Sequence, residues 1–228
     1  MLQCLPSHSL VICWKPFMSV TPIFIGIAGA SASGKSLLAG TIYQELKQEL
    51  GDSALAIIKE DSYYREQGNL TIEERTEINY DHPNAFDHDL LIQHMDALHS
   101  GKDVEIPIYD YTIHNRSDQT FPLKPARIVI IEGILLLHDK AIRKRLDAKV
   151  FMDTPLDICL LRRLQRDIAE RGRTVESIIE QYKRTVRPMF LEFIEPTKQF
   201  ADIIVPRGGK NRVAIEMLKA RILQMLDD

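Results

Sequence analysis

One eight-residue motif constrains the fold of this chain more than any other feature of its sequence. Its residues are, in order, Gly29, Ala30, Ser31, Ala32, Ser33, Gly34, Lys35 and Ser36, which match G-x-x-x-x-G-K-[ST]. An apolar run leads into the motif and an amphipathic helical pattern leaves it, so its glycines can turn backbone N–H groups toward phosphate oxygens at a helix N-terminus. The motif therefore predicts a phosphate-binding loop, in which Lys35 reaches the β- and γ-phosphates of a nucleotide and the Ser36 hydroxyl is a ligand of Mg²⁺.

The rest of the chain alternates between strand and helix patterns. Five apolar runs are expected to be strands, at Ile23–Ala28, Leu55–Lys59, Arg127–Ile131, Lys149–Asp153 and Asp202–Val205. Continuous rather than alternating apolar character is typical of a parallel sheet that is covered on both faces. Helical patterns lie at 36–50, 87–99, from 154 onward and at 211–226. The alternation predicts an α/β, doubly wound fold with a five-stranded parallel sheet of the P-loop NTPase type.

Two of the helices carry more detailed expectations. Thr154 is expected to be the N-cap of its helix, with Pro155 at the first helical position. In the last helix, the residues expected to face inward are Val213, Leu218, Ile222 and Met225.

Composition narrows the class of partner. The chain has 228 residues, of which 45% are hydrophobic and 27% charged, and its net charge is −3, so it has a globular core and no basic excess for binding nucleic acid. No run approaches the roughly 20 apolar residues of a membrane span, so no membrane partner is expected. Three cysteines, Cys4, Cys13 and Cys159, are too few for a disulfide framework and fit a cytoplasmic location.

The first 21 residues precede the organised pattern. We expect residues 1–21 to be a disordered N-terminal extension. Met18 is an alternative start, because the strand and helix pattern begins just after it.

Residues 103–124 interrupt the alternation of strands and helices. An apolar and aromatic run from Val104 to Tyr111 is followed by the polar stretch Asn115–Gln119 and then by Thr120 and Phe121. This pattern predicts a β-hairpin insertion. An insertion at the ligand end of such a sheet usually shapes a substrate pocket.

Two carboxylates follow predicted strands. Asp61 follows the strand at 55–59, and Glu132 follows the strand at 127–131, so both should face the ligand crevice at the carboxyl edge of the sheet. Glu132 is positioned to orient Mg²⁺ or its waters, and Asp61, beside the same metal, to accept a proton from an attacking hydroxyl. Asp61 is alternatively a helix cap or turn former. Local sequence leaves Asp81 equally a turn residue or a ligand.

Five arginines fall within twelve positions, at Arg162, Arg163, Arg166, Arg171 and Arg173. Gly172 should break the helix that carries them, and Thr174 should cap the next one. A helix–loop–helix of this kind fits a lid over residues 162–181 that closes on a transferring phosphate. The alternative is a solvated face, balanced by Asp157, Asp167, Glu170 and Glu176.

With these residues in place, the chain resembles the uridine–cytidine kinase family of P-loop nucleoside kinases from about Ile23 to its C-terminus. The segments that carry the resemblance are Gly29–Ser36, Glu60–Tyr64, Tyr80–Asp87, Ile106–Tyr111, Ile131–Ile134, Arg166–Asp167 with Glu170–Arg173, and Pro196–Lys198. The pair Tyr63–Tyr64 stands where the family often has Phe-Tyr. The resemblance implies a P-loop kinase domain over 22–228 that uses ATP or GTP, with Mg²⁺, to phosphorylate the 5′-hydroxyl of uridine or cytidine in pyrimidine salvage. It also implies a homotetramer.

The resemblance further implies roles for individual residues. Asp61 would be the base, and Asp81 would bind the ribose hydroxyls together with Arg163 and Gln181. Tyr109 would stack on the pyrimidine, and His114 would contact the edge of the ring. The other members of the implied substrate-binding and phosphate-lid sets are Tyr64, Tyr80, Tyr111, Arg166, Arg171 and Arg173.

Three alternatives remain. A related P-loop kinase with another acceptor, such as phosphoribulokinase or pantothenate kinase, shares the phosphate loop and the sheet. An NTP hydrolase or switch would need a water-positioning residue, and the N-K-x-D motif of a guanine-reading switch is missing because Arg212 follows Asn211. A catalytically inactive nucleotide sensor is disfavoured because Lys35, Ser36 and Asp61 are intact.

Overall fold

A single parallel sheet forms the centre of the molecule. The computed structural model describes residues 21–227, so all but one of the residues of the predicted extension, and with them Cys4 and Cys13, lie outside the described residues. The sheet has the order β2-β5-β1-β6-β7. Its strands are β1 (Ile23–Gly29), β2 (Leu55–Lys59), β5 (Ile128–Glu132), β6 (Ala148–Asp153) and β7 (Ile203–Pro206). The predicted five-stranded α/β fold is confirmed, with strand ends within one residue of the expected positions.

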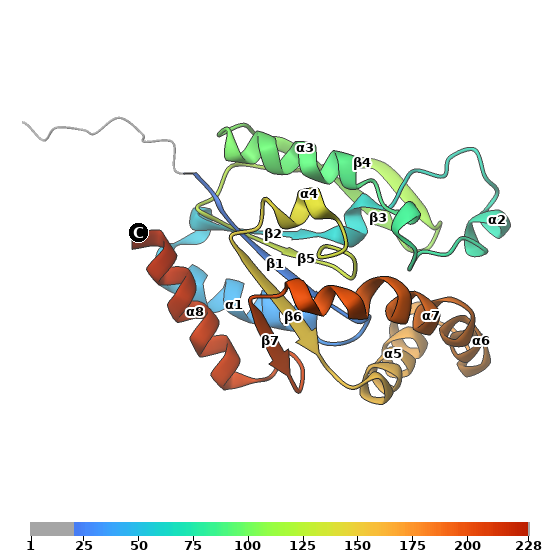
Figure 1. The fold of residues 1–228 in the computed structure, drawn as a ribbon. Coiled ribbons are helices and arrows are strands. Elements are labelled where there is room, and N and C mark those ends of the chain that lie inside the picture. Colours follow the sequence, from blue (N-terminus) through green and yellow to red (C-terminus); the bar gives the residue numbers. More distant parts are fainter. Residues whose placement is uncertain (1–20, 228) are drawn as a thin grey trace, which may run out of the picture.

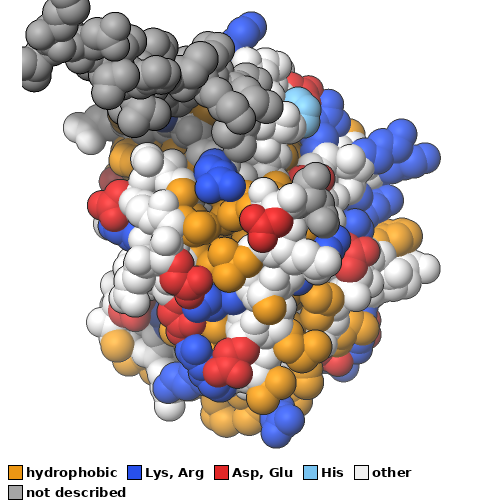
Figure 2. Space-filling model, turned by 90° about the vertical axis from the view of Figure 1, so that its left-hand side faces the viewer, with side chains coloured by type: hydrophobic (Ala, Val, Ile, Leu, Met, Phe, Trp, Pro, Cys, Tyr) orange, Lys and Arg blue, Asp and Glu red, His pale blue; other side chains and the backbone are white. Residues whose placement is uncertain are grey.

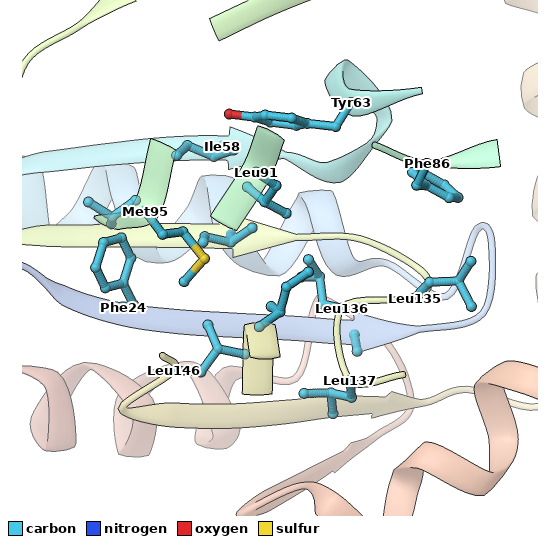
Figure 3. Packing of buried hydrophobic residues seen from close by; sticks show 14 of the residues in the cluster. Phe24, Ile58, Tyr63, Phe86, Leu91, Met95, Leu135, Leu136, Leu137 and Leu146 are labelled. Atoms are coloured by element: carbon cyan, nitrogen blue, oxygen red, sulfur yellow. The ribbon is translucent and has the colours of Figure 1, made fainter. Parts of the chain in front are cut away.

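Helices cover both faces of this sheet (Figure 1). On one face, α1 (Lys35–Leu50) and α8 (Arg212–Asp227) pack against Ile25 and Ile27 of β1. On the other face lie α3 (His88–His99) and α4 (Lys140–Arg143). Figure 3 shows Phe24 of β1 among side chains of α3 in that second layer. Neighbouring residues of β1 thus pack into hydrophobic cores on opposite faces of the sheet, which explains why the strand is apolar throughout.

The remaining helices lie beyond the ends of the strands. They are α2 (Ile72–Thr76), α5 (Leu156–Arg171), α6 (Val175–Gln181) and α7 (Arg187–Met189). Gly172, at φ 62°, ends α5, and the Thr174 hydroxyl accepts a hydrogen bond from Ser177 N at 3.2 Å to cap α6. Both boundaries follow the sequence signals, because glycine tolerates the left-handed conformation and threonine satisfies a free helix N–H.

The expected N-cap of α5 is wrong. The helix begins at Leu156, one residue later than expected, and Pro155 occupies the capping position. The Thr154 hydroxyl instead donates to the carbonyl oxygen of Ser33 at 2.9 Å. The Thr154 hydroxyl, which the local sequence pattern predicted to cap the helix, is therefore bonded to a residue 121 positions away in the chain.

The inward face of α8 was also partly mispredicted. Leu218 and Ile222 are buried as expected, but Val213 is 65% exposed and Ile215 takes its place in the core. Met225 is only half-buried. The face turned to the left in Figure 1, where α8 lies, mixes hydrophobic with charged side chains (Figure 2). Within residues 21–227, no helix combines the length and apolar character needed to cross a membrane.

The hairpin predicted over 103–124 is present as a separate two-stranded sheet. It consists of β3 (Val104–Asp110) and β4 (Asn115–Leu123), which pair antiparallel with a register shift between Pro107 and Tyr109. In the connecting loop, the Asp110 carboxylate accepts hydrogen bonds from Thr112 N and Thr112 Oγ1 at 2.7 and 2.6 Å. His114 has a φ of 49°, an uncommon conformation for a residue with a side chain. This loop therefore has a defined shape.

A buried carboxylate joins the loops that follow β2 and β5. Glu60 is fully buried, and its Oε2 accepts a hydrogen bond from Leu135 N at 2.9 Å. Its Oε1 lies 2.9 Å from His88 Nε2. Burial on its own lowers the pKa of His88, but the hydrogen bond and negative charge of Glu60, with Asp139 nearby, raise it overall. A Cβ atom on Gly133 would lie 2.1 Å from Glu60 Oε2 and 2.3 Å from Glu60 Cβ, so only glycine fits there.

Two glycine substitutions should therefore change stability in opposite directions. Gly133→Ala forces a methyl group into the Glu60 side chain and should lower the free energy of unfolding by about 1–3 kcal/mol, as overpacking does. The matched control Gly40→Ala lies inside α1 with no atom within 4 Å of the added Cβ. It should raise the free energy of unfolding by about 0.5–1 kcal/mol. Urea denaturation measures both, and a stable Gly133→Ala variant would contradict the packing described here.

Candidate active site

A cavity of about 880 Å³ lies at the carboxyl edge of the sheet and collects most of the predicted site residues. Among its lining residues are Ser31, Ala32, Gly34, Lys35, Ser36, Asp61, Tyr64, Tyr80, Asp81, Tyr109, Tyr111, His114, Glu132, Arg163, Arg166, Arg171, Arg173 and Gln181. Three loop residues, Gly29, Ala30 and Ser33, are buried and are not among the lining residues. The cavity therefore joins the phosphate loop to the hairpin and to the arginine-rich segment.

The phosphate loop has the geometry of an anion cradle. Gly34 adopts a φ of 101° immediately before α1, where it offers no side chain to occupy the free N–H groups of the first turn. Lys35 Nζ donates to Ala30 O at 2.9 Å, so the lysine folds back over the loop. Behind the loop, a Cβ on Gly209 would lie 2.4 Å from Gly34 O. Two glycine backbones therefore touch here, and the helix N-terminus is left for a ligand with phosphate oxygens.

Hard oxygen atoms meet at the first turn of α1. Ser36 Oγ donates to Glu132 Oε1 at 2.8 Å, and Asp61 lines the same cavity. Burial raises the pKa of Glu132, while the charge of Lys35 and the Ser36 hydrogen bond oppose that shift. Burial likewise lowers the pKa of Lys35, against the opposite charge of Glu132. A hydroxyl with one or two carboxylates is the protein share of a typical Mg²⁺ site, so these residues fit that metal.

Asp61 lies on a short turn after β2, next to the buried Glu60. The Tyr111 hydroxyl donates to Asp61 Oδ2 at 2.7 Å, so the hairpin reaches across to this carboxylate. Asp61 is half-buried at the cavity, within the turn Glu60–Tyr63, and is not a helix cap because Lys59 occupies that position. Its place beside the phosphate loop suits proton acceptance from a hydroxyl that attacks a phosphate.

Aromatic rings line the hairpin side of the cavity. The ring of Tyr64 lies 4.8 Å from that of Tyr109 and 5.1 Å from that of Tyr80. The His114 ring stacks on Tyr80 at 5.9 Å. Burial lowers the pKa of His114, and the charges of Arg173 and Arg171 lower it further. The imidazole is therefore neutral at pH 7, with one ring nitrogen as donor and the other as acceptor.

Asp81, which follows Tyr80 in the chain, also lines the cavity and is 7% exposed. Burial raises the pKa of Asp81, while the positive charge of Arg163 opposes the shift. Arg163 is itself held by its NH1 donating to Ser31 Oγ at 3.0 Å and its NH2 donating to Gln181 Oε1 at 2.9 Å. A buried carboxylate with an arginine beside it can accept hydrogen bonds from hydroxyls. The position of Asp81 therefore favours the interpretation that it binds a ligand over the interpretation that it only forms a surface turn.

The arginine-rich segment surrounds one fully buried carboxylate, Asp167. Four guanidinium groups lie within 4 Å of it: Arg166 at 2.8 Å, Arg173 at 3.5 Å, Arg163 at 3.6 Å and Arg171 at 3.7 Å. The alternative interpretation of this segment, a solvated face balanced in part by Asp167, does not hold for Asp167, because this carboxylate is fully buried beneath the arginines. One negative charge cannot neutralise four positive ones, so the segment presents a surplus of positive charge to the cavity.

The lining residues that the predictions did not name include Thr76, Thr112 and Ser177. A signal existed for Thr76, because Thr71 and Glu74 form a capping box that starts α2. Arg162 belongs to the arginine run and donates to Ser33 O at 3.4 Å. For Ser177, the only sequence signal is its position three residues after the helix cap Thr174.

Comparison with known proteins agrees with this geometry. A model of the Phosphoribulokinase / Uridine kinase family matches residues 24–214. A uridine kinase from Aeromonas salmonicida (strain A449) is 64% identical over 204 residues, which cover 90% of this chain and 95% of that protein. A uridine kinase from Tolumonas auensis is 62% identical over 204 residues, with the same coverage of 90% and 95%.

A solved structure supports the same assignment at the level of the fold. Phosphoribulokinase from Rhodobacter spheroides has a TM-score of 0.63 at 15% identity, over 83% of this chain and 71% of that one. This structure resembles the chain in fold alone, whereas the family model and the uridine kinases also resemble it in sequence. The chain is therefore a P-loop kinase and belongs to the phosphoribulokinase / uridine kinase family.

Proposed function

We propose that this chain transfers the γ-phosphate of ATP or GTP to the 5′-hydroxyl of uridine, and of cytidine, in pyrimidine ribonucleoside salvage. The observation that carries the proposal is one cavity that holds the phosphate loop, Asp61 and a group of aromatic rings. The relatives named uridine kinase, at 60–64% identity over about nine-tenths of the chain, support uridine as the acceptor. Phosphoribulokinase resembles this chain in fold, at only 15% identity. Ribulose 5-phosphate is therefore a weaker candidate acceptor.

The donor end of the cavity binds the nucleotide phosphates. Residues 29–36 wrap the phosphates, and Lys35 contacts the β- and γ-phosphates. Mg²⁺, when bound through Ser36 and Glu132 near Asp61, supplies charge neutralisation on the phosphate oxygens. Residues 162–181 act as a lid, in which Arg166, Arg171 and Arg173 stabilise negative charge on the transferring group.

The acceptor end binds the nucleoside. Asp81 accepts hydrogen bonds from the ribose hydroxyls, together with Arg163 and Gln181, and Asp61 accepts the 5′-hydroxyl proton. The rings of Tyr64, Tyr80 and Tyr109 offer a flat apolar wall for a pyrimidine, and Tyr111 completes it. Since a neutral His114 carries one donor and one acceptor, it can pair with the edge of either uracil or cytosine. That chemistry is the reason to include cytidine.

Assembly and location complete the proposal. A homotetramer follows from the family resemblance. A cytoplasmic location follows from that resemblance and from the sparse cysteines, of which Cys159 is buried and free.

An acceptor panel tests this function directly. Purified protein with Mg²⁺ and either ATP or GTP should convert uridine and cytidine to their 5′-monophosphates, detected by chromatography of the products. Ribulose 5-phosphate, pantothenate and a reaction without acceptor serve as parallel arms. Product from either of the other acceptors, with none from uridine, would overturn the proposal in favour of a related kinase. Phosphate release that needs no acceptor would favour a hydrolase.

Asp61→Asn tests the base. The amide keeps the shape of the side chain but cannot take a proton, so turnover should fall by about 10²–10⁴-fold. Nucleotide affinity, measured by calorimetry, should change little. Asp118→Asn, an exposed position on the hairpin, is the matched control and should behave as wild type. Near-normal turnover by Asp61→Asn would remove this residue from the base role.

Glu132→Gln tests the metal site. Loss of the negative charge beside Ser36 should raise the Mg²⁺ concentration that gives half-maximal activity by about 10–100-fold. Excess EDTA should abolish activity of the wild type, and added Mg²⁺ should restore it. An unchanged Mg²⁺ titration would exclude Glu132 from holding the ion.

A further inference from the structure

Tyr111 joins three parts of the cavity that are far apart in the sequence. Its hydroxyl donates to Asp61 Oδ2 at 2.7 Å, across 50 residues. The guanidinium carbon of Arg171 lies 4.5 Å from the centre of its ring. The rings of Tyr111 and Tyr109 pack nearly perpendicular to each other, with ring centres 5.1 Å apart. One side chain on the hairpin loop therefore touches the proposed base, the lid and the proposed pyrimidine wall.

The contact with Asp61 has a chemical consequence for proton transfer. A carboxylate on a surface turn can rotate, and a base must hold one oxygen toward the hydroxyl it activates. The Tyr111 hydrogen bond holds Oδ2 and leaves Oδ1 for the acceptor. A tyrosine hydroxyl is protonated at neutral pH, so the phenol keeps donating to this carboxylate.

The contact with Arg171 extends this arrangement into the lid. Arg171 NH1 lies 3.7 Å from Asp167 Oδ1, the carboxylate around which the other lid arginines gather. A guanidinium over an aromatic face is attracted to the ring. Asp167, Arg171, Tyr111 and Asp61 thus form a continuous series of contacts from the buried centre of the lid to the proposed base.

We propose that Tyr111 is a positioning residue, whose hydroxyl orients Asp61 and whose ring makes that orientation depend on the lid through Arg171. The proposal rests on the function proposed above. It goes beyond a nucleoside contact, because Tyr111 acts through Asp61 on the rate of transfer. Tyr111 is 41% exposed, so its replacement does not remove a core residue.

The hydroxyl is tested by Tyr111→Phe, which keeps the ring. Turnover of uridine should fall about tenfold, the size expected when a hydrogen bond to a charged group is lost at a partly exposed site. The KM for uridine should stay near the wild-type value. Tyr43→Phe, on α1 and outside the cavity, removes an equivalent hydroxyl and should leave both constants unchanged.

Two combined variants separate positioning from direct contact. In an Asp61→Asn background, measured by single turnover with excess enzyme, Tyr111→Phe should cost nothing further. Tyr111→Leu should cost an additional factor of about 2–5 over Tyr111→Phe, from loss of the ring contact with Arg171. That factor should vanish when Arg171 is replaced by Met.

The outcomes are distinct. A wild-type protein that forms no UMP overturns the proposed function and this inference together. Normal UMP formation by wild type, with Tyr111→Phe either at wild-type turnover or raising only the KM for uridine, overturns the inference alone. The same holds if the loss in Tyr111→Phe persists at full size in the Asp61→Asn background.

Discussion

Backbone pairing among three neighbouring strands sets the level at which the polar groups of the cavity lie. Ile27 of β1 and Lys59 of β2 both pair with Glu132 of β5. Two residues beyond that level, β1 reaches Gly29 and the chain after β2 reaches Asp61. Parallel register alone thus brings the phosphate loop and two carboxylates to one edge. Glu60 then holds the loops after β2 and β5 together through its bond to Leu135 N.

Much of this architecture could be predicted because it follows from short-range pattern. Continuous apolar runs predict strands buried on both faces, and the glycine-rich motif predicts the loop between β1 and α1. The hairpin at 103–124 was recognisable from its apolar and aromatic first run, although the polar stretch Asn115–Gln119 belongs to strand β4 and the connecting loop is 111–114. The five-stranded sheet was therefore within reach of the sequence alone.

What could not be predicted depends on contacts between distant residues. Thr154 has the local pattern of a cap, yet its hydroxyl binds Ser33 O, and no short-range signal distinguishes the two. Asp167 looks like one charge in a mixed run, but it is fully buried among arginines. No local pattern indicates that Glu60, which precedes Asp61 in the chain, is fully buried. For Asp81 and His114, the sequence suggested roles through resemblance, and the structure places both in the cavity while their roles stay predictions.

The contact between Gly34 and Gly209 has a consequence for the newly made chain. The backbone that supports the phosphate loop from behind comes from residue 209 of 228, and the edge strand β7 directly precedes it. A ribosome-bound chain that has exposed only its first half carries the complete glycine motif but lacks this support. The donor site is thus finished only after residue 209 has left the ribosome, so a product truncated before it would hold the motif without the backbone that supports the nucleotide cradle.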